Sequence, residues 1–324
     1  MLRIGILSAA HVHTPSYVHC LKGRTDAQVV GVWDHDAERG QGFADQFGLP
    51  FLGNLDALLE ACDAVVVTSE NRRHLALVEA AARAGKHILC EKPVVTSEDD
   101  AVAIEKVIIE TGVKFMTAFP CRYSPAFHRL RDRIRNGDIG EVQAICATNR
   151  GTCPFLWFVN PEESGGGAMI DHVVHVTDLL RALLGEEVVN VQAQIGSNVY
   201  GQTWDDTAML TLEFASGIFA TLDSSWSRPA SFRTWGDVTL NVVGTKGVIE
   251  LDMFGQDLQH YHPGGKSHSV VSYGSNLDQA MVDDFVHAVL TDGPVPVTLH
   301  DGLQAARVAI AGYRSASAGQ PVLA

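Results

Sequence analysis

Two hydrophobic periodicities alternate along the first 120 residues. Short runs rich in valine and isoleucine predict buried β-strands over residues 3–8, 28–34, 63–69, 86–90 and 113–119. The segments between them place apolar residues at helical spacing and predict helices that include residues 37–47, 54–61, 71–84 and 97–111. Nearly continuous apolar strands that alternate with helices are typical of a parallel sheet covered on both faces. We therefore expect a doubly wound, Rossmann-type α/β domain over residues 1–120.

The pattern changes after residue 120. We predict a helix over residues 125–136, a strand from Glu141, and a glycine-marked loop that ends at Gly167 and leads into a helix through Leu184. From residue 188 to about 271 the chain reads as consecutive strands with turn residues between them, which predicts an antiparallel meander. Helices are predicted to close the chain over 276–290 and 301–317. We expect an α+β domain with a large, mainly antiparallel sheet over residues 121–324, and its last helix is a candidate to pack back on the first domain.

Length and charge narrow the functional classes. The chain has 324 residues, which suits two domains at roughly 150 residues each. Its net charge of −14 repels phosphate backbones, so we expect no nucleic-acid partner. No apolar run approaches the ~18 residues of a membrane helix, and the first residues read as a strand instead of a secretory signal. We expect a cytoplasmic protein whose six cysteines, none in a CxxC pair, are small buried hydrophobes.

The turn after the first predicted strand lacks the glycines of a dinucleotide fingerprint. In that fingerprint, glycines let the backbone approach the pyrophosphate at the N-terminus of the next helix. Here the positions of G-x-G-x-x-G carry Ser8, Ala10 and His13, and His11 lies between them. Thr14, followed by a proline, reads as a helix N-cap. The turn by itself is therefore weak evidence for a dinucleotide.

Asp34 is evidence in favour of a dinucleotide-binding site. It ends the second predicted strand about 20 residues beyond the turn, where a carboxylate binds the ribose hydroxyls of adenosine. The same carboxylate repels a 2′-phosphate, which favours NAD over NADP. The alternative is that Asp34 only caps the following helix.

Two segments carry a resemblance to a known family. The first, AGKHILCEKP at residues 84–93, contains Glu91 and Lys92. The second, GGGAMIDHVVHVTD at residues 165–178, places Asp171, His175 and Asp178 on one stripe of a helix. Together they resemble the Gfo/Idh/MocA family of oxidoreductases, which includes glucose–fructose oxidoreductase and inositol dehydrogenase. The similarity runs almost from end to end, and it is specific for the fold and the location of the active site, not for one substrate.

The resemblance implies roles for individual residues. Lys92 and His175 would lie beside nicotinamide C4 and share acid–base work, because oxidation of a carbinol needs a base for the hydroxyl proton. Asp171 would help to hold the substrate. The residues implied in cofactor binding lie in the turn, at strand ends and around the lysine: Ser8, Ala10, His11, His13, Asp34, Ser69, Asn71, His74, Glu91 and Lys92. Family members commonly associate through the open face of the second sheet, so the resemblance also implies a homodimer or homotetramer.

Further side chains are candidates for contact with the substrate. Arg122 and Tyr123 follow a predicted strand whose carboxyl end converges on the site. Trp157 could stack against a sugar face, although packing in the core explains it equally well. The last candidate is His172, at a position where an apolar residue is common in the family.

The histidines raise a second possibility. His172 and His175, spaced i, i+3, could bind a metal with Asp171 or Asp178, and His11 and His13 could add ligands. The alternative is that these imidazoles bind substrate hydroxyls or satisfy the core, and we expect no metal. A further cluster, at positions 260, 262 and 268, is expected to be solvated.

Three functions remain open. The leading hypothesis is an NAD-dependent dehydrogenase acting on a secondary hydroxyl of a sugar, inositol or related polyol. The second is a redox-neutral glycosidase or lyase of similar fold that retains NAD. The third is a non-catalytic or metal-binding relative with a degenerate nucleotide loop.

Overall fold

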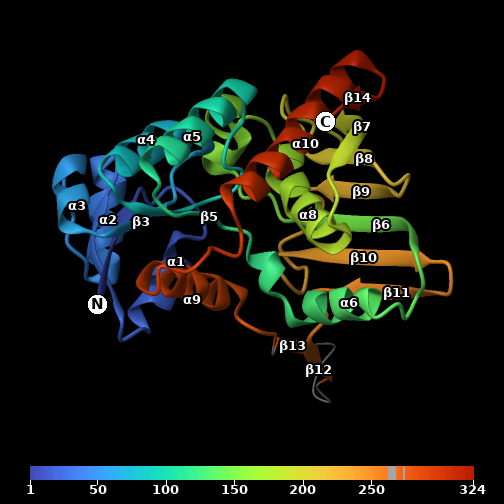
Figure 1. Cartoon of the computed structure of the whole chain (residues 1–324), viewed down its shortest axis with the longest axis horizontal. Helices are drawn as coiled ribbons and strands as arrows, with labels where there is room; N and C mark the ends of the chain where they lie inside the picture. Colours follow the sequence, from blue (N-terminus) through green and yellow to red (C-terminus); the bar gives the residue numbers. More distant parts are fainter. Residues whose placement is uncertain (262–267, 273) are drawn as a thin grey trace. The chain divides into compact units, whose positions relative to one another are not determined.

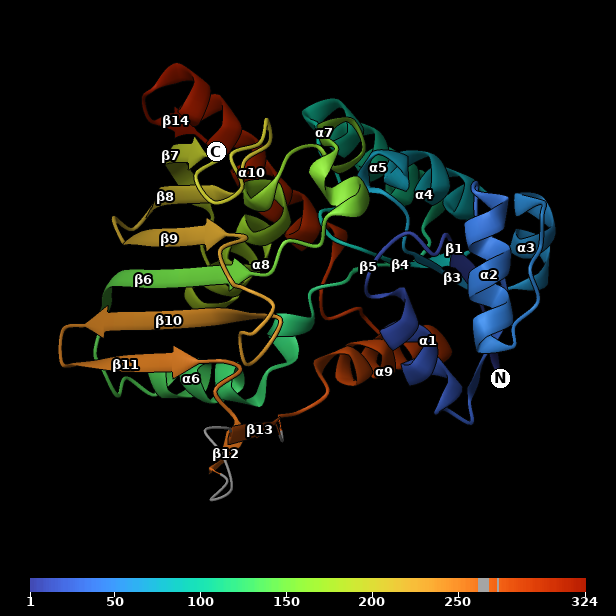
Figure 2. The same ribbon diagram turned by 180° about the vertical axis from the view of Figure 1, so that it is seen from behind.

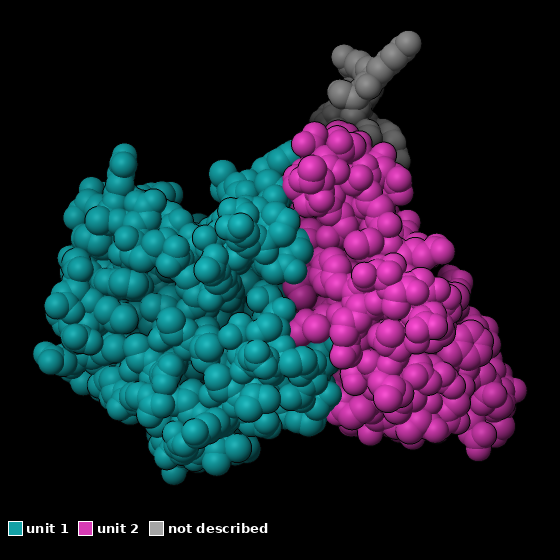
Figure 3. Space-filling model, turned by 90° about the horizontal axis from the view of Figure 1, so that it is seen from above, with its two compact units in different colours: residues 1–120, 154–166, 278–307 teal, residues 121–153, 167–277, 308–324 magenta. Residues whose placement is uncertain are grey.

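The computed structural model describes residues 1–261, 268–272 and 274–324, which form two compact units (Figure 3). Unit 1 contains residues 1–120, 154–166 and 278–307, and unit 2 contains residues 121–153, 167–277 and 308–324. His262 of the predicted histidine cluster lies outside the described residues. In the described parts of the chain, no helix combines the length and apolar character needed to cross a membrane.

Unit 1 is built on a parallel five-stranded sheet with the order β2-β1-β3-β4-β5. Its strands are β1 (Leu2–Leu7), β2 (Ala27–Trp33), β3 (Ala64–Val67), β4 (His87–Cys90) and β5 (Phe115–Thr117). Its helical elements are α1 (Thr14–Lys22), α2 (Ala37–Phe47), α3 (Leu55–Ala61), η1 (Asn71–Arg73), α4 (His74–Arg83), α5 (Glu98–Thr111), η3 (Leu156–Val159), α7 (Pro161–Ser164) and most of α9 (Leu277–Leu290). Figures 1 and 2 show α4 and α5 over one face of this sheet and α1 and α9 over the other. The predicted doubly wound domain is confirmed.

Local sequence sets the ends of the helices in unit 1. The Asp36 side chain accepts hydrogen bonds from the N–H groups of Glu38 and Arg39, and α2 ends at Gly48, whose φ of 61° suits glycine. The bounds of α2 are therefore those predicted. The prediction that Thr14 is the N-cap of α1 is wrong. Thr14 is the first helical residue, and its hydroxyl donates back to the His11 carbonyl at 2.8 Å.

The carboxyl ends of the parallel strands gather polar residues at one edge of the sheet. Ser8 follows β1, Asp34 follows β2, Ser69 lies two residues after β3, and Glu91 follows β4. All four are buried. This edge is where α/β folds of this type bind their ligands, so the topology brings together residues that are far apart in the sequence.

Unit 2 contains a seven-stranded sheet with the order β11-β10-β6-β9-β8-β7-β14. Its strands are β6 (Val142–Gly151), β7 (Val188–Gly196), β8 (Thr207–Phe214), β9 (Phe219–Ser225), β10 (Gly236–Gly244), β11 (Gly247–Asp252) and β14 (Val322–Leu323), and β12 (Asp257–Tyr261) and β13 (His268–Ser272) form a separate pair. The mainly antiparallel sheet is confirmed, but the simple meander is wrong. β6 lies between β10 and β9 and runs parallel to β9, because a strand from earlier in the chain is inserted there.

One face of this sheet is covered by helices. α8 (Ala168–Leu184) packs on β6, β8 and β9, and α6 (Pro125–Arg135) packs on β11, as Figure 2 shows. The alternation of buried and exposed residues along β8 agrees with one covered face and one face open to solvent. Cys146 on β6 is exposed, contrary to expectation, while the other five cysteines are buried.

The polar residues of α8 are buried together with its apolar ones. They include Asp171, His172, His175 and Asp178. α8 is therefore buried around most of its circumference. Gly185, in the left-handed conformation, caps the C-terminus of the helix. η2 (Pro120–Tyr123) precedes α6, and α10 (Leu299–Ala318) contributes its first part to unit 1 and its second part to unit 2.

Candidate functional site

The turn after β1 keeps the backbone of a nucleotide-binding turn without its glycines. Ser8 has a φ of 75°, in the left-handed region that a glycine would occupy. Its hydroxyl donates to Asp34 at 3.1 Å, and the Ala9 N–H donates to the same carboxylate oxygen at 2.8 Å. Asp34 therefore fixes the start of the turn from the end of β2. The backbone and the carboxylate fit a dinucleotide, because they supply the sharp turn and the acidic residue of that site.

Asp34 also forms an ion pair that sequence reasoning missed. Arg39 on α2 binds it with two nitrogens, Nε at 2.9 Å and Nη2 at 2.7 Å, and donates to Glu70 through Nη1 at 2.9 Å. Burial disfavours the charged form of Asp34, but the Arg39 guanidinium and the backbone N–H groups of Ala9 and Asp36 together outweigh burial and lower the pKa of the carboxyl. The signal in the sequence was an arginine five residues after the strand-ending aspartate, on the first turn of the next helix.

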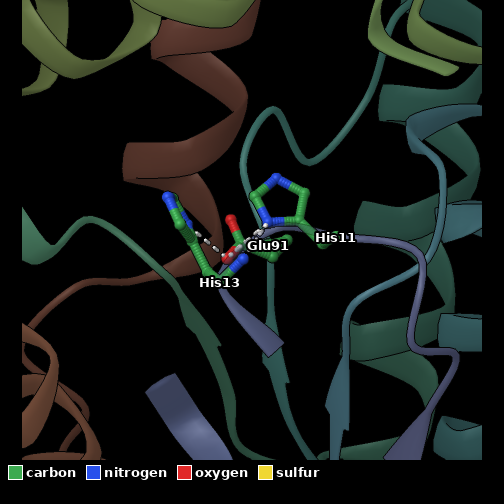
Figure 4. A group of neighbouring side chains, drawn as sticks. All are labelled: His11, His13 and Glu91. Atoms are coloured by element: carbon green, nitrogen blue, oxygen red, sulfur yellow. Dashed lines mark hydrogen bonds and ion pairs between the residues drawn. The ribbon is translucent and has the colours of Figure 1, made fainter. Parts of the chain in front are cut away.

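Glu91 lies at the centre of a second cluster (Figure 4). Its Oε1 atom lies 3.3 Å from His11 Nδ1 and 3.0 Å from His13 Nδ1, and it accepts a hydrogen bond from the Tyr17 hydroxyl at 2.6 Å. Its Oε2 atom accepts from the Lys92 backbone N–H at 3.0 Å. The two histidines of the turn are thus joined to the residue before the candidate catalytic lysine.

The carboxylate of Glu91 and the His13 imidazole that faces it shift one another's pKa values toward the charged forms. Burial disfavours the Glu91 carboxylate, but the two imidazoles outweigh that effect and hold its pKa well below the usual range. Burial likewise disfavours the His13 imidazolium, yet the facing carboxylate raises the pKa of His13. Burial, followed by the nearby Glu91 charge, raises the pKa of Tyr17 well above its ordinary value, so Tyr17 stays protonated and donates.

Aromatic residues of unit 1 hold His11 in place. Its ring centroid lies 5.3 Å from that of Phe158 and 5.9 Å from that of Trp157. The Trp157 indole N–H donates to the Ala10 carbonyl at 3.0 Å, and the Trp157 ring stacks on Phe158. Trp157 therefore packs against the turn, which sequence reasoning did not foresee because the two segments are far apart in the chain.

The remaining cofactor candidates of unit 1 are buried and hydrogen-bonded. The Ser69 hydroxyl donates to the Glu70 carbonyl, and the Asn71 amide donates to the Ser164 carbonyl at 2.8 Å. His74 Nδ1 lies 2.9 Å from the Pro93 carbonyl, which it reaches as a donor, and burial lowers its pKa. His74 thereby fixes the segment that follows Lys92.

In unit 2, Asp171 is held by two neighbours. The Trp226 indole N–H donates to its Oδ2 atom at 3.1 Å, and His172 Nε2 lies 3.3 Å from the same oxygen. The other ring nitrogen of His172 lies 3.0 Å from the Asn149 carbonyl, to which it donates. His172 therefore links β6 to the candidate catalytic aspartate, and Trp226 is a further residue that the sequence did not reveal.

The other candidates of unit 2 lie close to this helix. Arg122 binds Asp178 through two hydrogen bonds, of 2.9 and 2.6 Å, so its guanidinium is engaged by α8. Tyr123 is half-buried beside it in the chain, and His175 is buried one helical turn after Asp171.

The N-terminus of α8 is capped from a distant segment. The Asp205 carboxylate accepts hydrogen bonds from the N–H groups of Gly167 at 2.9 Å and Met169 at 2.8 Å, and from the Tyr313 hydroxyl at 2.9 Å. A Cβ atom on Gly167 would lie 1.9 Å from the Asp205 carbonyl oxygen, so only glycine fits there. No local signal could have identified Asp205, because it lies 38 residues after Gly167.

Potential metal ligands gather at one place in the described parts of the chain. The donor atoms of His11, His13 and Glu91 all lie within 4.8 Å of one another. The set suggested from sequence, in which two histidines of α8 join an aspartate, does not form such a group among the described residues.

Two family models match the sequence. Residues 2–119 match the model described as "Oxidoreductase family, NAD-binding Rossmann fold", and residues 127–250 match the "GFO/IDH/MocA C-terminal domain". The two matches follow one another along the chain and cover most of both predicted domains.

Individual relatives agree with these matches. Inositol 2-dehydrogenase of Rhizobium meliloti (strain 1021) is 33% identical over 76% of this chain and 74% of its own. 2,7-Anhydro-N-acetylneuraminate hydratase of Escherichia coli (strain K12) is 33% identical over 68% of this chain and 60% of its own. The crystal structure of an aldose-aldose oxidoreductase from Caulobacter crescentus superposes with a TM-score of 0.83 at 25% identity, covering 100% of this chain and 99% of that one.

Proposed function

Since the chain belongs to the Gfo/Idh/MocA family of oxidoreductases, we propose that it is an NAD-dependent dehydrogenase that oxidises a secondary hydroxyl of a sugar, an inositol or a related polyol. The observation that carries the proposal is the burial of Lys92, which is 3% exposed at the carboxyl end of β4, in the domain that matches an NAD-binding family. An ionisable side chain buried at the ligand-binding edge of such a sheet is a candidate for acid–base work. The relative named as an inositol dehydrogenase supports the substrate class.

The residues of unit 1 would bind the cofactor. The turn from Ser8 to His13 would face the pyrophosphate, and Asp34 would bind the ribose. When bound, NAD supplies the acceptor for the hydride that leaves the carbinol carbon. Ser69, Asn71 and His74 would line the same edge of the sheet.

The charge around Asp34 favours NAD over NADP. Arg39 lies between Asp34 and Glu70, and Arg73 lies 3.4 Å from Glu70 and 3.9 Å from Glu163. Three carboxylates thus face two guanidinium groups and the His35 imidazole, so the network is net negative when that imidazole is neutral, and a net negative charge disfavours a 2′-phosphate.

Three residues would carry the chemistry. Lys92 and His175 would take the proton of the substrate hydroxyl as hydride leaves, and Asp171 would orient that hydroxyl. Asp171 can hold a fixed orientation because Trp226 and His172 bind it on the side of the sheet. Arg122, Tyr123 and Trp157 remain candidates for contact with the rest of the substrate.

A lysine variant with a matched control tests this proposal. Lys92→Met should retain the rise in melting temperature caused by NADH and lose about 10²- to 10⁴-fold in kcat on any inositol or sugar that reduces NAD. Lys106→Met, which removes a 72% exposed lysine of α5, should leave both unchanged. Turnover by Lys92→Met within a few-fold of the wild type would show that Lys92 is not the acid–base group.

A redox-neutral reaction is the second candidate. It is favoured by the relative named as a hydratase, a name that describes addition of water without net oxidation. In that case the protein would bind NAD and convert substrate without accumulating NADH. Absorbance of NADH during turnover, measured together with product formation, separates the two candidates.

We further propose that the chain forms a homodimer or homotetramer through the open face of the unit 2 sheet. Met209 and Phe219 are about half exposed on this sheet, and large apolar side chains on an exposed sheet face favour association. Sedimentation of the wild type and of a Met209→Lys/Phe219→Lys variant tests this, since the variant should be monomeric.

A further inference from the structure

The cluster around Glu91 has the composition of a metal site. Two imidazoles and one carboxylate are the ligands of many Zn²⁺ sites and of related first-row divalent ions. They come from two segments of unit 1, the turn after β1 and the end of β4. Figure 4 shows both imidazoles and the carboxylate directed toward one another, and the intervening Val12 is exposed.

The distances between the donor atoms agree with a common ion. Ligands bound tetrahedrally at about 2.0–2.1 Å lie about 3.4 Å from one another. His11 Nδ1 and His13 Nδ1 lie 3.3 and 3.0 Å from Glu91 Oε1. The His13 backbone N–H donates to His11 Nδ1, at 3.2 Å, so this nitrogen is unprotonated; a bound ion would take over the lone pair that this hydrogen bond uses.

The surroundings have the further features of a metal site. Tyr17 donates to Glu91 Oε1 and the Lys92 backbone N–H donates to Oε2, so both carboxylate oxygens are oriented by hydrogen bonds. The side chains of His11 and Glu91 are almost completely buried, whereas that of His13 is 33% exposed. An ion held by these three ligands would therefore keep a coordination position accessible from the His13 side, as open metal sites do.

We propose that His11, His13 and Glu91 bind a divalent transition-metal ion of the Zn²⁺ class. Two of the ligands lie in the turn after β1 and the third follows β4, and the inference does not depend on the substrate or on the redox reaction proposed above. A bound cation offsets the cost of burying a carboxylate between two imidazoles.

The experiment uses the full-length protein, stripped with a chelator, loaded with Zn²⁺ and passed through gel filtration. We expect one Zn²⁺ per chain by elemental analysis of the wild type, and a loss of bound Zn²⁺ in His13→Ala and in Glu91→Gln. His287→Ala removes an exposed imidazole of α9 and should retain the metal. Tyr17→Phe keeps all three ligands and should weaken Zn²⁺ binding by about 10- to 100-fold.

Two further measurements distinguish a variant that has lost a metal ligand from a variant that is misfolded. Co²⁺ added to the stripped wild type should give visible d–d absorption bands, which Zn²⁺ displaces and His13→Ala lacks. Thermal unfolding of each variant without metal verifies that it is folded. Absence of stoichiometric Zn²⁺ in the wild type, or equal retention by His13→Ala, would overturn the proposal and leave the cluster as a carboxylate that shares a proton with its histidines.

Discussion

Replacement of Asp205 by alanine should destabilise the helix that carries the candidate catalytic aspartate. The Asp205 carboxylate accepts three hydrogen bonds, from the N–H groups of Gly167 and Met169 and from the Tyr313 hydroxyl. It is 9% exposed, so water cannot fully replace it. A negative charge at this position also interacts favourably with the dipole of α8.

The expected loss of stability in Asp205→Ala depends on which N–H groups keep an acceptor after the carboxylate is removed. Gly167 keeps an alternative acceptor, the Tyr313 oxygen at 3.1 Å, but the Met169 N–H is left buried without its acceptor. A buried donor that loses its partner costs about 1–3 kcal/mol, and loss of a helix cap costs about 0.5–2 kcal/mol. We therefore expect Asp205→Ala to lower the free energy of unfolding by about 3 kcal/mol, and Tyr313→Phe by about 1 kcal/mol.

Urea denaturation followed by circular dichroism measures this difference. Asp138→Ala, which removes an exposed carboxylate paired with Arg133, is the matched control and should change stability by less than about 0.5 kcal/mol. If Asp205→Ala unfolds within about 1 kcal/mol of the wild type at an unchanged denaturant slope, the cap does not stabilise α8 as argued.

Three further changes test other parts of the structure. Asp34→Ala should weaken NADH binding and strengthen NADPH binding, each by about 10-fold in calorimetry, because it removes a ribose ligand and leaves the Arg39 guanidinium with Glu70 as its remaining carboxylate partner. Unchanged selectivity would contradict this role. Gly151→Ala places a Cβ atom 2.7 Å from the His172 ring and should lower kcat by about 10-fold or more while the protein stays folded. A variant with the kcat of the wild type would show that the position of this ring does not matter for the reaction. Burial disfavours the ionised form of Asp237, but the hydrogen bonds from Arg228 and Thr148, together with the charges of Arg150 and Arg228, outweigh burial and lower the pKa of the carboxyl. The ionised Asp237 side chain therefore contributes its full stabilisation of the fold above the unfolded pKa of about 3.9, and this contribution is lost as the pH falls through the folded pKa. The wild type should lose more stability below about pH 4 than Asp237→Asn. Parallel acid-unfolding curves of the two proteins would refute this.

The periodicity of the sequence determined the elements and their classes. Residues 37–47 were predicted and observed as a helix because Asp36 and Gly48 give local start and stop signals. The helix from Ala168 to Leu184 could likewise be predicted, because its apolar residues surround a polar stripe and a glycine follows it. These features depend on residues within a few positions of one another, which a single sequence displays directly.

The partners of those elements were decided only by the tertiary structure. The insertion of β6 beside β9 could not be predicted, because hydrophobic alternation reveals that a strand is buried but not which strand lies next to it. The same holds for Asp205 at the end of α8 and for Arg39 at Asp34, where the partner of a charge is set by how the chain folds back. Glu91 could be recognised from its motif, and His13 from its place at a glycine position of the fingerprint. Their convergence on one point depends on the parallel order of β1 and β4 around β3, which brings the carboxyl ends of distant strands to a common edge.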